Sequence, residues 1–257
     1  MRIVVLVKEV PDTYGDRLLD LETGLADRAA SERVLDEIGE RAIEAAVVIK
    51  EAAGDAEVVL VTMGPESAST GLRKGLAMGA DRAVHVLDAE LAGADLTLTA
   101  ETLAAAVRRE EPDLVIAGVL STDGTGAVIP AMVAEHLGAA HLTSMNSIAV
   151  ADGRASGVRA TDLGTAAVSA ALPAVVSITE AMPEARFPNF KGIMAAKKKP
   201  LDAVSLADLG LTASLQTPRS IMTSIAQKPA RSGGTVIVDE GDGGERLAQF
   251  LISNKLV

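Results

Sequence analysis

Residues 114–137 read "LVIAGVLSTDGTGAVIPAMVAEHL" and contain one complete strand, loop and helix pattern. The apolar run at 114–117 indicates a short buried strand. A helical pattern follows at 126–137, and the loop before it, "GVLSTDGTGAV" at 118–128, holds three glycines, several hydroxyl groups and one acid. A strand, a loop and a helix in this order make up one unit of an α/β fold.

The same order recurs upstream of this unit. Apolar runs alternate with amphipathic stretches, which implies right-handed crossovers and a doubly wound, mostly parallel sheet. The signals at helix ends agree, because Asp36 suits an N-cap, Pro65 suits a first helical position, and Gly79 and Gly138 follow helix ends. The other expected strands are 2–7, 58–62 and 83–86, and the other expected helices are 36–53, 65–78 and 96–109.

Beyond the parallel part, the pattern changes to short segments. Turn signals at Asp152-Gly153 and Gly164 divide residues 144–171, which predicts antiparallel hairpins added to the sheet. The run "LPAVVSIT" at 172–179 then reads as one more buried strand. We therefore expect an α/β nucleotide-binding domain over residues 1–200.

Residues 201–257 are expected to form a C-terminal arm. Their Ser/Thr/Gly/Pro-rich middle part has too few apolar residues for a core of its own. Only "SLADLGL" and residues 245–253 read as short helices. An arm of this kind usually lies on another molecule, and a partner subunit is the natural candidate.

Composition limits the possible functions of the 257-residue chain. Trp is absent and Tyr occurs once, so the core must be aliphatic. The lack of Cys excludes disulfides, iron–sulfur clusters and a cysteine nucleophile, and the net charge of −11 argues against a general nucleic-acid binder. The chain begins with the strand-like "MRIVVLVK", and no apolar run approaches bilayer length, so we expect a soluble cytoplasmic protein without membrane insertion.

A ligand crevice is expected beyond the carboxyl ends of the parallel strands. Three segments converge there in this interpretation: "VKEVPDT" at 7–13, "TMGP" at 62–65, and the loop at 118–128. Small residues before a helix bring backbone N–H groups close to a phosphate, and Asp123 can accept hydrogen bonds or form a turn beside them. An ordinary turn remains the alternative, because neither a P-loop nor a dinucleotide fingerprint is present.

No group in the chain stands out as catalytic. None of the three histidines (His85, His136 and His141) accompanies a spaced acid or nucleophile, so each reads as a packing residue. The acids Glu37, Glu40 and Glu44 have the spacing of a solvated helix face. With no metal-ligand set either, the sequence indicates a nucleotide holder without acid–base machinery.

The segment "RFPNFKGIMAAKKKP" at 186–200 is unusual for this chain. It holds two of the three phenylalanines, four lysines and an arginine within a loop interrupted by Pro and Gly. We expect it to dock a protein partner. The alternative is a loop folded onto its own subunit, with Phe187 in the core.

Five segments together resemble the beta subunit of electron-transfer flavoprotein, over about residues 2–212. They are, in order, "VVLVKEVPDT", "GLAMGADRAVHV", "LVIAGVLSTDG", "LPAVVSIT" and "RFPNFKGIMAAKKKP". The resemblance implies the adenine-nucleotide α-hydrolase-like form of the α/β fold. It also implies a heterodimer with an alpha subunit that holds most of an FAD. This heterodimer would accept electrons from acyl-CoA and related dehydrogenases in fatty-acid β-oxidation and pass them to a quinone reductase. The chain would then be an electron-carrier subunit and not a stand-alone enzyme.

The resemblance also assigns residues to sites. A structural AMP would be held by Leu6, Asp36, Glu37, Ile38, Gly39, Met63, Gly118, Ser121, Thr122, Asp123, Gly124, Thr125, Gly126, Ala127 and Val128. The FAD ring edge would approach Val10, Pro11, Asp12, Thr13, Tyr14 and Ile38. Partner docking would involve Phe190, as the anchor, with Lys191, Ile193, Met194, Lys197, Lys198 and Lys199.

Two features depart from the family pattern. Ala160 and Ala166 stand where acids are usual, and an acid at the first position is thought to pair with the alpha subunit and hold its mobile FAD domain. We therefore expect a looser or differently latched flavin domain. Two alternatives stay open: an electron-bifurcating relative with a second FAD in place of AMP, and an ATP-binding regulator of the universal-stress type, whose G-x-x-G-x(9)-G-[ST] segment is absent here.

Overall fold

The computed structural model describes residues 1–15, 18–28, 30–212, 219–230 and 233–257. The chain forms two compact units, Met1–Thr223 and Ser224–Val257. The first unit thus includes residues 201–223, which we had assigned to the arm.

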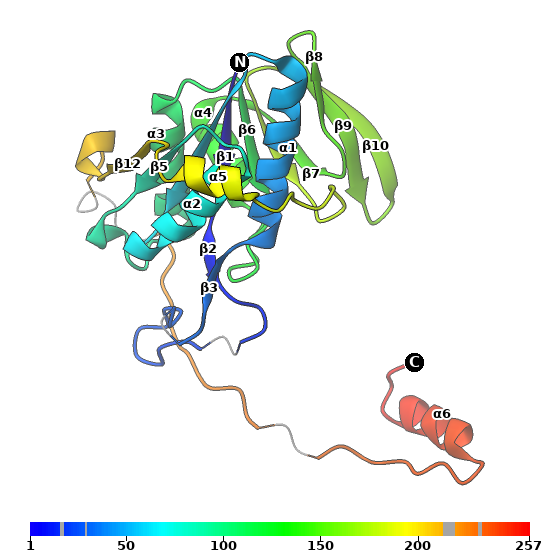
Figure 1. Ribbon diagram of the computed structural model, residues 1–257. Coiled ribbons are helices and arrows are strands. Elements are labelled where there is room, and N and C mark those ends of the chain that lie inside the picture. Colours follow the sequence, from blue (N-terminus) through cyan, green and yellow to red (C-terminus); the bar gives the residue numbers. More distant parts are fainter. Residues whose placement is uncertain (16–17, 29, 213–218, 231–232) are drawn as a thin grey trace. The chain divides into compact units, whose positions relative to one another are not determined.

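A ten-stranded sheet forms the centre of the first unit (Figure 1). Its strands run in the order β10-β9-β7-β11-β6-β1-β4-β5-β12, and β8 pairs with β9. Every pairing from β7 through β12 in this order is parallel, which confirms the predicted α/β fold. The parallel strands are β1 (Arg2–Leu6), β4 (Glu57–Met63), β5 (Arg82–Val86), β6 (Leu114–Gly118), β7 (Ala140–Met145), β11 (Ala174–Ile178) and β12 (Leu201–Val204).

Helices cover both faces of this sheet (Figure 1). Successive side chains of β1 point to opposite faces, so Ile3 joins one apolar cluster with α1 and α2, while Val4 joins the other with α3 and α4. Both clusters are aliphatic, as the composition predicts. The helices are α1 (Glu37–Ala53), α2 (Ser69–Met78), α3 (Leu96–Arg109) and α4 (Ile129–Leu137), with short 3-10 turns at Glu66–Ala68, Ala89–Leu91 and Ala207–Leu209.

The antiparallel extension lies where the sequence predicts it. Strands β8 (Ala149–Ala151), β9 (Arg154–Thr161) and β10 (Gly164–Ala171) pair antiparallel, and β9 joins them to β7. The expected strand at 172–179 is β11, whose five residues are all buried.

Several local details differ from the sequence-based expectations. Pro65 precedes a 3-10 turn and α2 begins only at Ser69. Asp36 occupies the N-cap position of α1 without a side-chain cap bond, because its carboxylate is turned toward the loop after β6. A small second sheet of β2 (Glu9–Pro11) and β3 (Arg33–Leu35) was not expected. Two strands of the main sheet were not expected either: β7, which pairs with β11, and β12, which pairs with β5 at the edge.

The segment at 186–200 is not the irregular loop that we expected. It contains a seven-residue helix, α5 (Phe190–Ala196), beside α2. Asn189 begins this helix, because its side-chain oxygen accepts a hydrogen bond from Gly192 N at 2.8 Å. Because Pro188 precedes the Asn189 cap and lies outside the helix, it does not interrupt α5.

In the second unit, the described residues form one helix, α6 (Gly243–Ser253), and no strand. Asp239 Oδ1 accepts hydrogen bonds from Gly241 N and Gly243 N just before this helix. Several large apolar side chains on and after α6 are exposed, namely Leu247, Phe250, Ile252, Leu256 and Val257. Within the described residues, no helix combines the length and the apolar character needed to cross a membrane.

Candidate functional site

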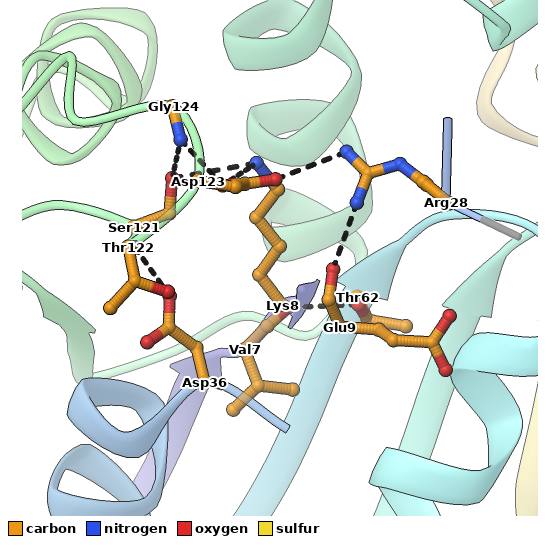
Figure 2. A network of polar contacts seen from close by, with 10 residues as sticks. All are labelled: Val7, Lys8, Glu9, Arg28, Asp36, Thr62, Ser121, Thr122, Asp123 and Gly124. Atoms are coloured by element: carbon orange, nitrogen blue, oxygen red, sulfur yellow. Dashed lines mark hydrogen bonds and ion pairs between the residues drawn. The ribbon is translucent and has the colours of Figure 1, made fainter. Parts of the chain in front are cut away.

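A charged pair joins two loops at the carboxyl ends of the central strands (Figure 2). Lys8, just after β1, places its Nζ 2.7 Å from Asp123 Oδ1 and 3.4 Å from Ser121 Oγ, both in the loop after β6. Thr62 in β4 donates its hydroxyl to Val7 O at 2.8 Å. The three segments expected to converge at a crevice therefore lie together.

Arg28 is a second cation at this crevice, and sequence reasoning missed it. Its Nη2 lies 3.1 Å from Asp123 Oδ2, and its Nη1 donates to Glu9 O at 3.4 Å (Figure 2). Arg28 belongs to the connection between β2 and β3, 95 residues away from Asp123. No local pattern around Arg28 indicates such a contact.

Asp123 is held ionised by these neighbours. Burial opposes its ionisation, but the hydrogen bond and charge of Lys8, the Ser121 hydroxyl and the charge of Arg28 together lower its pKa to about 2. Only 8% of the Asp123 side chain is exposed. Both cations are thus engaged by one carboxylate.

Asp36 is the opposite case at the same crevice. It is 2% exposed, and its Oδ2 accepts a hydrogen bond from Thr122 N at 2.9 Å. Its Oδ1 has no hydrogen-bond partner among the described residues. Burial raises the pKa of Asp36, and the negative charge of Asp123 adds to this. The bonds from Thr122 oppose the rise, as does a contact with Ile38 N that falls short of hydrogen-bond geometry. A buried oxygen without a partner is a position where a ligand donor would be favourable.

The loop before α4 presents backbone amides to this crevice. Thr125 and Ala127 adopt positive φ angles of 50° and 55°, and Thr125 N donates to Ser121 O at 2.9 Å. The next residues, 126–128, are exposed, and no hydrogen bond within the described part of the chain uses their N–H groups. Free N–H groups at a helix start are suited to an anion.

A close backbone approach completes the crevice. A Cβ on Gly118 would lie 2.6 Å from Ile38 Cγ2, so glycine lets the end of β6 lie against the first turn of α1. The other predicted AMP residues lie at the ends of the same elements: Leu6 ends β1, Met63 ends β4, Glu37 and Gly39 begin α1 with Ile38, and Gly124 follows Asp123.

The residues predicted to face a flavin divide into two groups. Val10 and Pro11 lie in β2 and are buried. Thr13 and Tyr14 are exposed, Tyr14 to 97%, and Asp12 Oδ1 accepts a hydrogen bond from Tyr14 N at 2.9 Å. The exposed pair, with half-buried Asp12 and Ile38, is the accessible part of this set.

The predicted docking residues lie on or next to α5. Phe190 is 79% exposed, and Phe187 is 94% exposed and therefore no part of the core. Ile193 and Met194 are exposed as well. Of the lysines, Lys191, Lys197 and Lys198 form no ion pair within the described residues, which leaves their charges available.

Lys199 differs from the expectation that it would face a partner. Its Nζ donates to Leu76 O at 2.9 Å and to Ala80 O at 2.5 Å, so it is turned toward its own subunit. Burial lowers the pKa of this ammonium group, and the charge of Asp81 opposes that effect.

The histidines lie outside this constellation. His85 is buried in β5 with its Nε2 3.0 Å from Gly64 O, whereas His136 is exposed and His141 is half-buried in β7. Among the described residues, no group of three or more His, Cys, Asp or Glu side chains could hold a metal ion.

Comparison with known proteins gives a consistent result. The family described as "Electron transfer flavoprotein domain" matches residues 23–209. The chain is 45% identical to the electron transfer flavoprotein subunit beta of Mycobacterium leprae (strain TN) and 44% identical to that of Mycobacterium tuberculosis (strain ATCC 25618 / H37Rv), with 99% of both chains covered in each case. It is also 34% identical to the caffeyl-CoA reductase-Etf complex subunit CarD of Acetobacterium woodii, with 92% of each chain covered.

Proposed function

This chain belongs to the electron transfer flavoprotein family as a beta subunit, and from that membership we propose that it carries a structural AMP and pairs with an alpha subunit. The pair shares an FAD that the alpha subunit mainly holds. The chain is the supporting half of an electron carrier and not an enzyme by itself.

The observation that carries the AMP proposal is the unpartnered Oδ1 of buried Asp36. A nucleoside offers amino and hydroxyl donors to such an oxygen, which compensates for the cost of its burial. The exposed N–H groups of residues 126–128 suit the phosphate. Because Lys8 and Arg28 are both engaged by Asp123, the phosphate depends mainly on these backbone groups.

The proposed flavin edge is the exposed turn at Thr13 and Tyr14, with Ile38 beside it. A bound FAD would supply the electron storage that the side chains of this chain lack. The part played by the chain would be to shape and shield one side of the ring.

Helix α5 is the proposed docking element for acyl-CoA or related dehydrogenases, which links the protein to fatty-acid β-oxidation. An exposed ring such as Phe190 provides a large contact area at a low entropic cost. Lys191, Lys197 and Lys198 steer an acidic partner toward it. The reduced carrier then passes its electrons to a quinone reductase.

The proposed wrapping arm is the second unit, Ser224–Val257, and within it α6 offers the contact surface. Its exposed Leu247 and Phe250 are three residues apart, so they share one face of the helix. A subunit interface is the favourable environment for such a face.

The proposed loose latch concerns β9 and β10. Ala160 pairs with Thr165, and Ala166 pairs with Arg159. Because both positions are alanines, neither offers a carboxylate to a partner. We expect small-angle scattering of the heterodimer to report a wider distribution of flavin-domain positions than in a relative with the acids. Identical scattering curves would contradict this proposal.

Identification of the bound nucleotides tests the proposed function. The purified beta chain and the co-expressed heterodimer are denatured, and the released nucleotides are separated and weighed by mass spectrometry. We expect one AMP per beta chain in both samples and one FAD only with the alpha subunit. Release of ATP would favour the stress-type regulator, and release of two FADs would favour the bifurcating relative.

A further inference from the structure

We propose that Arg186 and Lys199 are positioning residues that hold α5 in a ready conformation for docking. This inference rests on the docking role proposed above. It adds that two clamps, each formed between residues of this chain, determine how well Phe190 is presented.

Apolar packing alone does not fix α5. Of its seven residues, Ala196 is the buried one. A hollow of about 290 Å³ lies beside the helix and is lined in part by Met78, Phe187, Pro188 and Ala195. A helix this short is marginal by itself in water, so other contacts must hold it.

The first clamp is at the start of the segment. The Arg186 side chain donates to Glu44 from Nε at 2.7 Å and from Nη2 at 2.9 Å, and its backbone N donates to Glu44 Oε2 at 3.1 Å. The same guanidinium donates to Glu51 from Nη1 at 2.6 Å and from Nη2 at 3.0 Å. Both glutamates lie on α1, so a forked pair fixes the entry of the segment to a core helix.

The second clamp is at the end of the segment. The Lys199 ammonium group donates to carbonyl oxygens at the C-terminal end of α2, Leu76 O and Ala80 O. In return, Arg73 on α2 donates from Nη1 to Ala196 O at 2.7 Å and to Lys199 O at 2.8 Å. Each helix end thereby receives a cation from the other segment, which satisfies carbonyls that a helix end leaves open.

Gly192 shows that α5 is seated closely on α2 between these clamps. A Cβ at this position would lie 2.5 Å from Ala77 O. The backbone of α5 is thus fixed while Phe190 remains 79% exposed. A preorganised element of this kind avoids the entropic cost of ordering on binding.

The test uses the full heterodimer with an acyl-CoA dehydrogenase as electron donor. Arg186→Lys keeps the charge but loses the fork, and Lys199→Met keeps the stem but loses the ammonium group. We expect amide hydrogen exchange over residues 187–199 to become at least about tenfold faster in each variant. The KM for the flavoprotein should rise by a similar factor of about ten, while kcat at saturation stays within about twofold.

Matched controls separate this proposal from the docking role. Lys198→Met removes the same charge one residue earlier, so its exchange should match the wild type. Unchanged exchange in Arg186→Lys and Lys199→Met would overturn the clamps. Faster exchange with an unchanged KM would show that the clamps do not affect docking. In that case Phe190→Ala tests the docking role separately. A raised KM in Phe190→Ala would support the docking role of α5, and an unchanged KM would overturn it.

Discussion

Lys8 Nζ lies 2.7 Å from Asp123 Oδ1, and this ion pair joins the end of β1 to the loop that precedes α4. The pair is asymmetric, because the Asp123 side chain is 8% exposed and that of Lys8 is 41% exposed. Removal of the lysine therefore leaves a mostly buried carboxylate with Arg28 as its remaining ion-pair partner within the described residues.

Lys8→Met is expected to lower the free energy of unfolding by about 1–2 kcal/mol at neutral pH, since one of the two cations paired with Asp123 is lost. Denaturant titration measures this change. The double variant Lys8→Met/Asp123→Asn should lose less free energy of unfolding than the two single variants lose together, because it no longer contains the unpaired Asp123 charge. Strict additivity would contradict the coupling.

The stability that Asp123 contributes depends on pH. Its folded pKa of about 2 lies below its ordinary value of 3.8, so the unfolded chain binds the proton first as the pH falls. The contribution is present above about pH 4 and is lost as the pH falls toward about 2. The difference in the free energy of unfolding between the wild type and Asp123→Asn should narrow between about pH 5 and about pH 2. A gap that stays constant would show that the carboxylate is not paired in solution.

Asp36 should show the opposite sign. Its folded pKa is raised above 3.8, so stability is lost as the pH rises from the unfolded pKa through the folded one. Asp36→Asn should therefore stabilise the nucleotide-free chain at neutral pH, which denaturant titration of the apoprotein measures.

The same Asp36→Asn variant should retain less AMP, by at least about tenfold, because an amide N–H₂ group replaces the free acceptor. Nucleotide release from equal amounts of protein measures the loss. AMP retention equal to that of the wild type would remove Asp36 from the nucleotide site.

Gly118→Ala should destabilise the crevice by about 1–3 kcal/mol, because the new methyl group would lie 2.6 Å and 2.7 Å from Ile38 Cγ2 and Cγ1. Gly71→Ala is the matched control: it lies inside α2, and a Cβ there would be at an ordinary 3.4 Å from Leu35 Cδ1. We expect Gly71→Ala to be neutral or slightly stabilising in thermal unfolding. Equal melting temperatures for the two variants would contradict the close approach.

Leu247→Ala/Phe250→Ala should weaken association with the alpha subunit at least about tenfold, because it removes the two large side chains that share a face of α6. Sedimentation of mixed subunits measures the association. Gln249→Ala on the same helix is the control and should bind normally. Equal association of the double variant would place the subunit interface elsewhere.

The sequence predicted five of the seven parallel strands, β1, β4, β5, β6 and β11, because they are mostly buried and read as apolar runs. It missed β7 and β12, which are only partly buried. Residues 114–137 were divided correctly into strand, loop and helix, although α4 begins three residues later than expected, after the positive φ of Ala127. Strands β2 and β3 were missed because each is three residues long and carries little apolar signal.

The sequence indicated which loops line the candidate site but not which side chains contact one another there. Glycines and hydroxyls indicated the loop after β6, whereas the approach of Arg28 to Asp123 depends on how a distant connection folds back. The helix α5 was missed because Pro188 and Gly192 read as breaks. Gly192 is in fact what lets that helix approach Ala77.

The exposure of Tyr14 has a practical consequence for spectroscopy. The chain has no Trp and this one Tyr, whose side chain is 97% exposed beside the proposed flavin edge. Its emission is therefore an intrinsic, single-site signal without background from the aliphatic core. Quenching of that emission when the flavin-bearing partner is added would report the approach of the ring without any label.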